Sequence, residues 1–259
     1  MKQTKISGSE EIGFHEGLEK ELSTYFEKTI HEDGSVSVEQ VSNPYFLVND
    51  KWNVNDIGEI KQFKEMAENY TYSNKNIHFR LNNPLVNLEV KYVYYKQLFN
   101  DLWTIKSVFV AQSPLKRVTE FINEKYPKLS SLLDLDIEKA EREYLFWLNE
   151  KGIQTQTIKR NSLIEKDYVS KSDVAAFLRI IYTALFQYTD KREEWKKDRW
   201  DIRNLHDRYG IDYNKSINLY YIDFSKIPTT IREQVKKYFK QRLLSKNKFS
   251  WGTARNYML

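Results

Sequence analysis

The sequence predicts a mainly α-helical protein with two helical modules, the second of them truncated, and a small β or irregular segment at the N-terminus. Three observations support this fold class. Apolar residues recur at helical spacing from residue 53 onward. Only 8 glycines and 5 prolines occur in 259 residues, which disfavours a β-sandwich, barrel or propeller with many turns. The chain is 41% hydrophobic and 15% aromatic, so it can build a packed core and is not a disordered tail.

The first part of the chain divides into an acidic segment and a helical module. Residues 1–50 carry 4 lysines against 10 acidic residues, and a hairpin is expected where the stretches 24–30 and 36–40 flank Asp33-Gly34. Residues 51–152 form the first helical module. The helices expected there, with a short Ile-x-Phe strand between the first two, lie at 57–67, 88–103, 113–124 and 136–151.

The ends of two of these helices are marked by residues that cap or stop helices. Ser113-Pro114 suits a cap and a first turn, and Tyr126-Pro127 ends that helix. Asp136 can cap the last helix, which Lys151-Gly152 closes. These signals make the middle of the chain the most clearly predicted part.

The remaining residues are expected to form a linker region and a second module. Residues 153–197 are predicted as a polar linker followed by a helix that Ser172 caps. Residues 198–259 form the second, basic module, which is incomplete. A total of 259 residues exceeds the usual 100–200 of one domain, which agrees with two modules.

A weak internal repeat relates the two modules. Residues 51–57 (KWNVNDI) resemble residues 199–205 (RWDIRNL), and an Ile-x-Phe piece follows in each copy at 77–79 and 222–224. Residues 250–259 look like the first half of the helix equivalent to 113–124. Duplication therefore predicts that Trp52 and Trp200 occupy equivalent places, and the alternative is convergent helix composition.

Charge is distributed unevenly along the chain. The net charge is +5, but residues 191–259 carry 17 Lys and Arg against 8 Asp and Glu, a local net of +9. A basic region of this kind suits a polyanion, because each cation that meets a phosphate releases a counterion. The alternative is an ordinary solvated basic face.

The helix expected at 231–244 is the strongest candidate binding element. Ile231, Val235, Tyr238 and Phe239 are expected to face inward, leaving a cationic stripe to run along a phosphate backbone. A second contact is expected just after Ser250, which can cap a helix whose N-terminal amides favour a phosphate. The candidate DNA-binding residues are Arg232, Lys236, Lys237, Lys240, Lys246, Lys248, Thr253 and Arg255.

Signals for catalysis, cofactors and membranes are missing from the sequence. Cysteine is absent, and the sequence contains neither a Walker loop nor another nucleotide-binding glycine motif. His206-Asp207-Arg208 is better explained as a solvated loop than as an acid–base site. No catalytic residue, metal or cofactor is therefore expected. The mean hydropathy of −0.68 and the lack of a long apolar run exclude a membrane helix, and the cytoplasm is the expected compartment.

Three stretches of the second module resemble a known family. Residues 198–205 (DRWDIRNL), 221–228 (YIDFSKIP) and 231–243 (IREQVKKYFKQRL) are similar to the region that opens the core-binding domain of large tyrosine recombinases, the integrases and transposases of site-specific transposons. Residues 115–122, 126–127, 132–135 and 137–148 resemble the helical, SAM-like fold of the same domain. The resemblance implies two SAM-like modules that grip duplex DNA, with other recombinase protomers as further partners.

The chemistry of that family is absent from this sequence. Its catalytic domain carries an Arg, a Lys, a His-x-x-Arg motif and a nucleophilic Tyr, but none of His15, His31, His78 and His206 is followed by Arg at the third position. The resemblance therefore implies the DNA-binding N-terminal part of a recombinase without its active site. The alternative function is a helical protein-interaction or regulatory protein, and a standalone nuclease is disfavoured.

Overall fold

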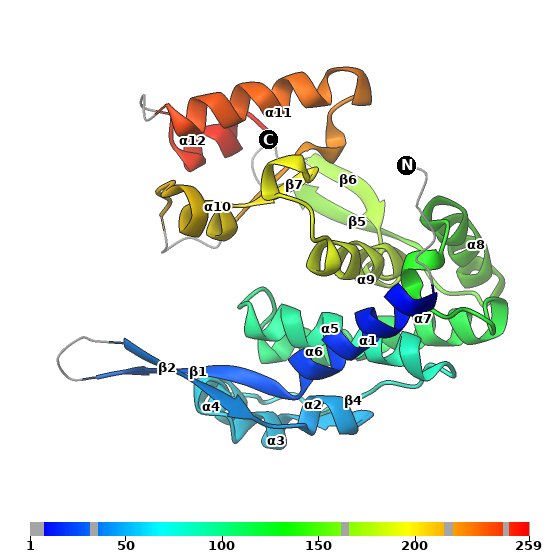
Figure 1. Ribbon diagram of the computed structural model, residues 1–259. Helices are drawn as coiled ribbons and strands as arrows, with labels where there is room; N and C mark the ends of the chain where they lie inside the picture. The colour runs from blue at the N-terminus through cyan, green and yellow to red at the C-terminus, as the bar shows by residue number, and fades with distance from the viewer. Residues whose placement is uncertain (1–7, 32–35, 162–165, 215–219, 246–248, 259) are drawn as a thin grey trace. The chain divides into compact units, whose positions relative to one another are not determined.

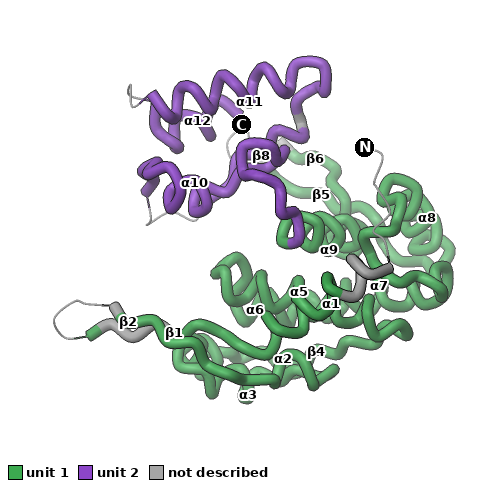
Figure 2. The backbone as a smooth tube through the Cα atoms, viewed as in Figure 1, with its two compact units in different colours: residues 1–188 green, residues 189–259 purple. Residues whose placement is uncertain are grey.

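The computed structural model describes residues 8–31, 36–161, 166–214, 220–245 and 249–258. The chain is mainly α-helical, as predicted, and each sheet among the described residues has two strands (Figure 1). The chain divides into two compact units, residues 1–188 and 189–259, called unit 1 and unit 2 below (Figure 2). Each unit has its own hydrophobic core.

Unit 1 begins with a helix that the sequence analysis did not find. Helix α1 (Gly8–Leu22) packs against α5 (Pro84–Phe99), where His15 Nε2 lies 3.0 Å from the buried carboxylate of Glu89. Three glycines lower its intrinsic helix propensity, so its stability comes from tertiary packing. The hairpin expected next is confirmed as β1 (Thr24–Ile30) paired with β2 (Val36–Ser42). Its expected Asp33-Gly34 turn lies outside the described residues.

The central part of unit 1 contains the helices predicted at 88–103, 113–124 and 136–151, whereas the single helix expected at 57–67 is divided into the end of α3, a 3₁₀ turn and α4. Asp136 caps α8 by accepting a hydrogen bond from the backbone N–H of Lys139, as expected, whereas Ser113 lies inside α7 and not at its cap. The elements in order are α2 (Tyr45–Val48), β3 (Lys51–Asn53), α3 (Val54–Gly58), α4 (Lys64–Glu68), β4 (Asn76–His78), α5, α6 (Ile105–Val110), α7 (Gln112–Lys125) and α8 (Ile137–Glu150).

The linker expected at 153–171 is instead a β-hairpin. Strand β5 (Gln156–Asn161) pairs with β6 (Lys166–Lys171), with Ile158 opposite Val169. Residues 153–157 (IQTQT) alternate β-branched residues with glutamine, which is a strand pattern. The following helix, α9 (Asp173–Thr189), is not a separate element either, because Ala175, Leu178 and Ile181 are fully buried in the core of unit 1. The Ser172 hydroxyl accepts from the N–H of Ala175, as expected of its cap.

Unit 2 is built from short strands and helices around a smaller core. Its elements are β7 (Arg199–Asp201), α10 (Ile202–Tyr209), β8 (Tyr221–Asp223), α11 (Thr229–Leu244) and α12 (Trp251–Asn256). Gly210 ends α10 with a φ of 63°, a left-handed conformation that glycine adopts without strain. Trp200, Ile202, Leu205, Phe224 and Ala254 are fully buried in this core.

The two units share the internal geometry that the repeat predicts. Trp52 pairs with Ile77 across β3–β4, and Trp200 pairs with Ile222 across β7–β8. Each indole N–H donates to the carbonyl three residues earlier, at 3.1 Å in both cases. The ring of Trp52 lies 4.6 Å from Phe79, and that of Trp200 lies 4.4 Å from Phe224. The predicted equivalence of the two tryptophans is confirmed.

One detail of the repeat differs from the sequence-based alignment. The expected partner of residues 250–259 was the helix at 113–124, but α12 matches the short α6. Ser250 caps α12 by accepting from Thr253 N–H, and Thr104 caps α6 by accepting from Ser107 N–H. Both caps also place two hydroxyls in contact, at 3.0 and 3.1 Å. A shared cap in front of two helices of equal length, six residues each, outweighs the loose similarity to α7.

Among the described residues, no helix combines the length and the apolar character that a membrane span needs.

Candidate nucleic-acid interface

Helix α11 carries most of the candidate residues, and its central lysine is not exposed. Only 3% of the surface of Lys236 is accessible. Its Nζ donates to the Glu233 carboxylate at 2.8 Å, to the carbonyl of Lys196 at 3.2 Å and to Asp198 at 3.5 Å. The expectation that Lys236 faces phosphates on an outer stripe is therefore wrong, because acidic and carbonyl oxygens bind its ammonium inside unit 2.

Arg232 lies on the same side of α11 and also has structural partners. Its guanidinium donates to Asp198 at 3.0 Å and to the carbonyls of Ser225 and Ile227. These bonds attach α11 to the loop that precedes it. The expected outer position of Arg232 is therefore also wrong.

Unit 1 contains the same arrangement at equivalent positions of α5. Lys91 is buried there, and its Nζ donates to the carbonyl of Leu47 and to Asp50. Asn87 takes the place of Arg232 and donates to Asp50 at 3.0 Å. The buried lysine is thus a feature of the repeat, with Asp50 and Asp198 as the matching acceptors, and its role is structural.

With Arg232 and Lys236 inside, α11 is rotated relative to the predicted orientation. Ile231 and Tyr238, which were expected in the core, are 46% and 53% exposed, whereas Phe239 and Leu243 are buried. The face of α11 that points away from the core of unit 2 is called the open face here. It comprises Gln234, Lys237, Tyr238, Gln241 and Arg242, all of them exposed.

The equivalent face of α5 is covered by protein. The repeat offset of 145 residues aligns Gln234, Lys237 and Gln241 with Glu89, Tyr92 and Lys96. Glu89 is buried against His15 of α1, and both Tyr92 and Lys96 bind the carboxylate of Glu21 on α1. The same helix face is therefore an internal packing surface in unit 1 and a solvent-facing surface in unit 2.

The other candidate residues differ in their exposure to solvent and in their contacts within the protein. Lys237 is exposed, and Lys240 is half-buried with its ammonium 5.3 Å from the ring of Trp195. Thr253 and Arg255 are half-buried on α12, where the Thr253 hydroxyl contacts Ser250. Trp251 is buried in the core, as expected. Lys246 and Lys248 lie outside the described residues.

The sequence analysis missed an arginine–tyrosine cluster on β7, β8 and α10. The guanidinium of Arg199 lies 3.9 Å from the ring of Tyr221, and that of Arg203 lies 4.6 Å from the ring of Tyr220. Arg203 also donates to both carboxylate oxygens of Asp201 and to the hydroxyl of Tyr221. The available signal was the presence of Arg199 and Arg203 beside Trp200, together with Tyr220 and Tyr221 beside the Ile-x-Phe piece.

Burial and ion pairing shift the pKa values in this cluster. Burial would lower the pKa of the Arg203 guanidinium, but the hydrogen bonds to Asp201 outweigh it and raise the pKa above its ordinary value. Burial also raises the pKa of the Tyr221 hydroxyl. Arg203 therefore stays cationic and Tyr221 stays neutral at physiological pH.

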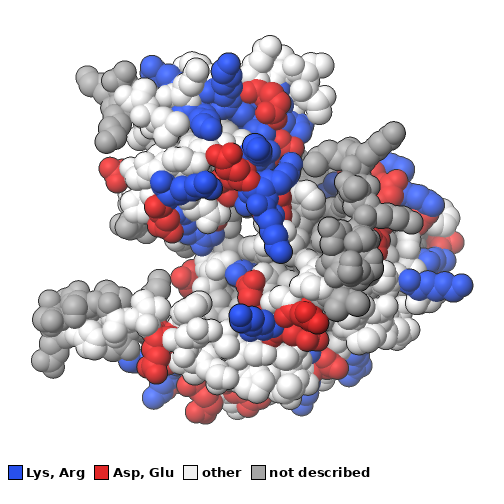
Figure 3. Space-filling view, in the orientation of Figure 1, with Lys and Arg blue, Asp and Glu red and all other residues white. Residues whose placement is uncertain are grey.

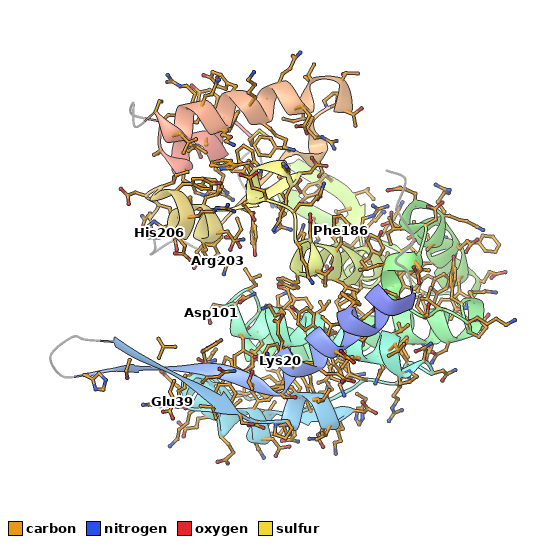
Figure 4. All side chains as sticks on the ribbon, in the orientation of Figure 1. Lys20, Glu39, Asp101, Phe186, Arg203 and His206 are labelled. Carbon is orange, nitrogen blue, oxygen red and sulfur yellow. The ribbon has the colours of Figure 1, made fainter. Side chains whose placement is uncertain are left out.

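No metal-binding constellation is found in the described part of the chain. His206 and Arg203 lie on α10 (Figure 4), and His206 Nδ1 lies 3.0 Å from the carbonyl of Ile211, so the histidine takes part in closing a loop. Among the described residues, no group of three His, Asp or Glu side chains could hold a metal ion. In the view of Figure 3, Lys and Arg side chains gather over unit 2 with fewer acidic ones among them.

Comparisons with known proteins give one consistent relationship. The chain is 30% identical over 204 residues to transposase B of transposon Tn554 from Staphylococcus aureus strains Mu50 and N315. It is 29% identical over 208 residues to transposase B of transposon PsiTn554 from Staphylococcus aureus. Neither a family profile nor a solved structure matches.

These relatives are transposases, and similarity to them covers most of this chain. Each alignment includes 76% of the chain but only 32% of the relative. The chain thus spans about a third of the length of the curated relatives it matches. The chain is therefore similar to part of these transposases.

Proposed function

We propose that this chain is the DNA-binding N-terminal part of a tyrosine site-specific recombinase or transposase and grips duplex DNA for integration or recombination. Two observations support the proposal. The chain is similar to transposon transposases, and unit 2 leaves one helix face open where unit 1 covers the equivalent face with α1. The open face carries the proposal, because it presents cations and amides that can bind a polyanion.

The electrostatics of the open face favour nucleic acid. Lys237 and Arg242 have no carboxylate partner among the described residues, whereas Glu233, the one acidic residue of α11, binds Lys236. Lys240, Lys246, Lys248, Thr253 and Arg255 are further proposed contacts. Phosphate contacts of this kind fix the position of a protein on DNA and make affinity depend on salt.

We propose protein–protein contact as a second function, for unit 1, because exposed apolar side chains lie on both of its hairpins. Ile158 and Val169 face each other across β5–β6 and are 73% and 64% exposed, and Phe26 and Val38 are exposed on β1–β2. An apolar surface of this kind suits contacts with protein, such as other recombinase protomers. If the whole chain were only a protein-interaction module, duplex DNA would not bind it in a salt-dependent way.

Binding of a fluorescent duplex by residues 1–259 tests the proposal. We expect dissociation constants near or below the range of about 10⁻⁴–10⁻⁶ M that is typical of non-specific DNA binding at physiological salt, with tighter binding at low salt. The absence of any binding at low salt would exclude the proposed function.

The same protein should neither cleave nor join DNA. The sequence has no His-x-x-Arg motif, and no group of three His, Asp or Glu side chains that could hold a metal ion occurs among the described residues. After incubation of the protein with duplex DNA, denaturing electrophoresis should therefore show no covalent protein–DNA adduct. An adduct that requires one tyrosine of this chain would show that it holds a strand-transferring active site.

A further inference from the structure

We infer that Gln234 and Gln241 read base edges in the major groove of duplex DNA, so that α11 contributes sequence preference as well as affinity. This inference rests on the proposed DNA binding. It concerns the amide side chains of the open face, whereas the cations of that face account for contacts to phosphates. The two roles can be separated, because base contacts specify a sequence and phosphate contacts do not.

The two glutamines occupy the centre of the open face. They are seven residues apart, so they lie on the same side of α11, separated by roughly 10 Å along the helix axis at about 1.5 Å per residue. That distance corresponds to about three base-pair steps at ~3.4 Å each. Each glutamine would therefore meet a different base pair, with about two pairs between their contacts.

Cations lie on both sides of this amide row. At about 100° per residue, Lys237 is turned about 60° to one side of Gln234 and Arg242 about 80° to the other. A helix inside a groove has a phosphate backbone on either side, so this order of cation, amide and cation fits a major groove, which admits an α-helix. A helix that only crossed one backbone would need cations on one side.

The amides are free to bind a ligand. Neither glutamine side chain has a hydrogen-bond partner in the protein among the described residues, and both side chains are exposed. A glutamine amide carries a donor and an acceptor and can pair with N6 and N7 of adenine. In unit 1 the equivalent residues, Glu89 and Lys96, bind side chains of α1 instead.

The composition of the face also favours DNA over a covering helix. In unit 1 the equivalent face of α5 is covered by protein. The positions that correspond to Ile231 and Tyr238 are Val86 and Val93, which are fully buried beside Glu89. Unit 2 has Ile231 and Tyr238 there, both substantially exposed, beside an amide centre with cations on either side. Side chains of that apolar type can contact thymine methyl groups in the groove.

Selection of binding sites from a randomised duplex pool tests the inference on the full chain. The wild-type protein should select sites with A·T pairs at two positions about three steps apart. Gln234→Ala should lose the preference at one position and Gln241→Ala at the other, each weakening binding to the selected site roughly 5- to 150-fold. Replacing the contacted adenine by 7-deazaadenine should weaken the wild type but not the matching variant.

Controls separate this inference from the proposed function. Alanine is a better helix former than glutamine, so both variants should fold. Lys237→Ala with Arg242→Ala should weaken binding to all sequences equally. Duplex binding without preference in the wild type, or with the same preference in both glutamine variants, overturns the base-reading role and leaves DNA binding intact. If no duplex binds at all, both the function and the inference fail.

Discussion

Replacing Lys236 by alanine should destabilise unit 2 by about 1–3 kcal/mol, the order of magnitude found when partly buried acceptors lose their hydrogen-bond donor. The substitution removes the donor that binds Glu233, Asp198 and the carbonyl of Lys196 inside the unit. Hydrogen exchange measures this directly, since the opening free energies of the α11 amides should fall while those of α5 stay unchanged.

Two further variants test whether the loss of stability comes from the buried contacts of Lys236. Lys237→Ala removes the adjacent, exposed charge and should change stability by less than about 0.5 kcal/mol. Lys91→Ala should produce a comparable loss in unit 1, because Lys91 binds Asp50 and a backbone carbonyl there, as Lys236 binds Asp198 and the carbonyl of Lys196. A Lys236→Ala protein as stable as Lys237→Ala would show that the buried contacts of Lys236 do not hold α11 in place.

Removing Lys237 and Arg242 together should weaken duplex binding without unfolding the protein. Each lost phosphate contact reduces the slope of log K against log salt by about 0.9, so the double variant should lose about 1.8. The affinity loss should be largest at low salt and independent of DNA sequence. Fluorescence anisotropy over a range of salt concentrations measures both quantities.

The control for this experiment removes two charges elsewhere. Lys64 and Lys128 are exposed in unit 1, so Lys64→Ala with Lys128→Ala matches the change in net charge. Its salt slope should equal that of the wild type. Equal slopes for both double variants would mean that binding follows net charge alone and that the open face has no special role.

Local rules predicted the mainly α fold and most helix ends. Asp136 and Ser172 cap helices because a side-chain oxygen satisfies a free N–H at the first turn, which depends on sequence neighbours only. The tryptophan repeat was also predictable, since Trp52 and Trp200 keep the same neighbours along the chain. The hairpin at 153–171 was missed because its polar strand pattern was read as a linker.

The candidate interface was predicted only in part, and Lys236 shows why. Helical spacing places Arg232, Lys236 and Lys240 in one stripe, and a stripe of cations normally faces water. Here the inward position depends on Asp198 and the carbonyl of Lys196, which lie far away in sequence. Lys91 within the apolar helix α5 was the available signal, because the repeat places it at the same position.

Salt titration of duplex binding by the full chain is the most direct test of the proposed DNA-binding role. Lys237 and Arg242 alone predict a negative slope of log K against log salt of about 1.8 or more, with further contacts adding about 0.9 each. Duplex binding of this steepness would support the proposed DNA-binding role. A slope near zero, or no duplex binding at low salt, would contradict that role and favour the protein-interaction alternative.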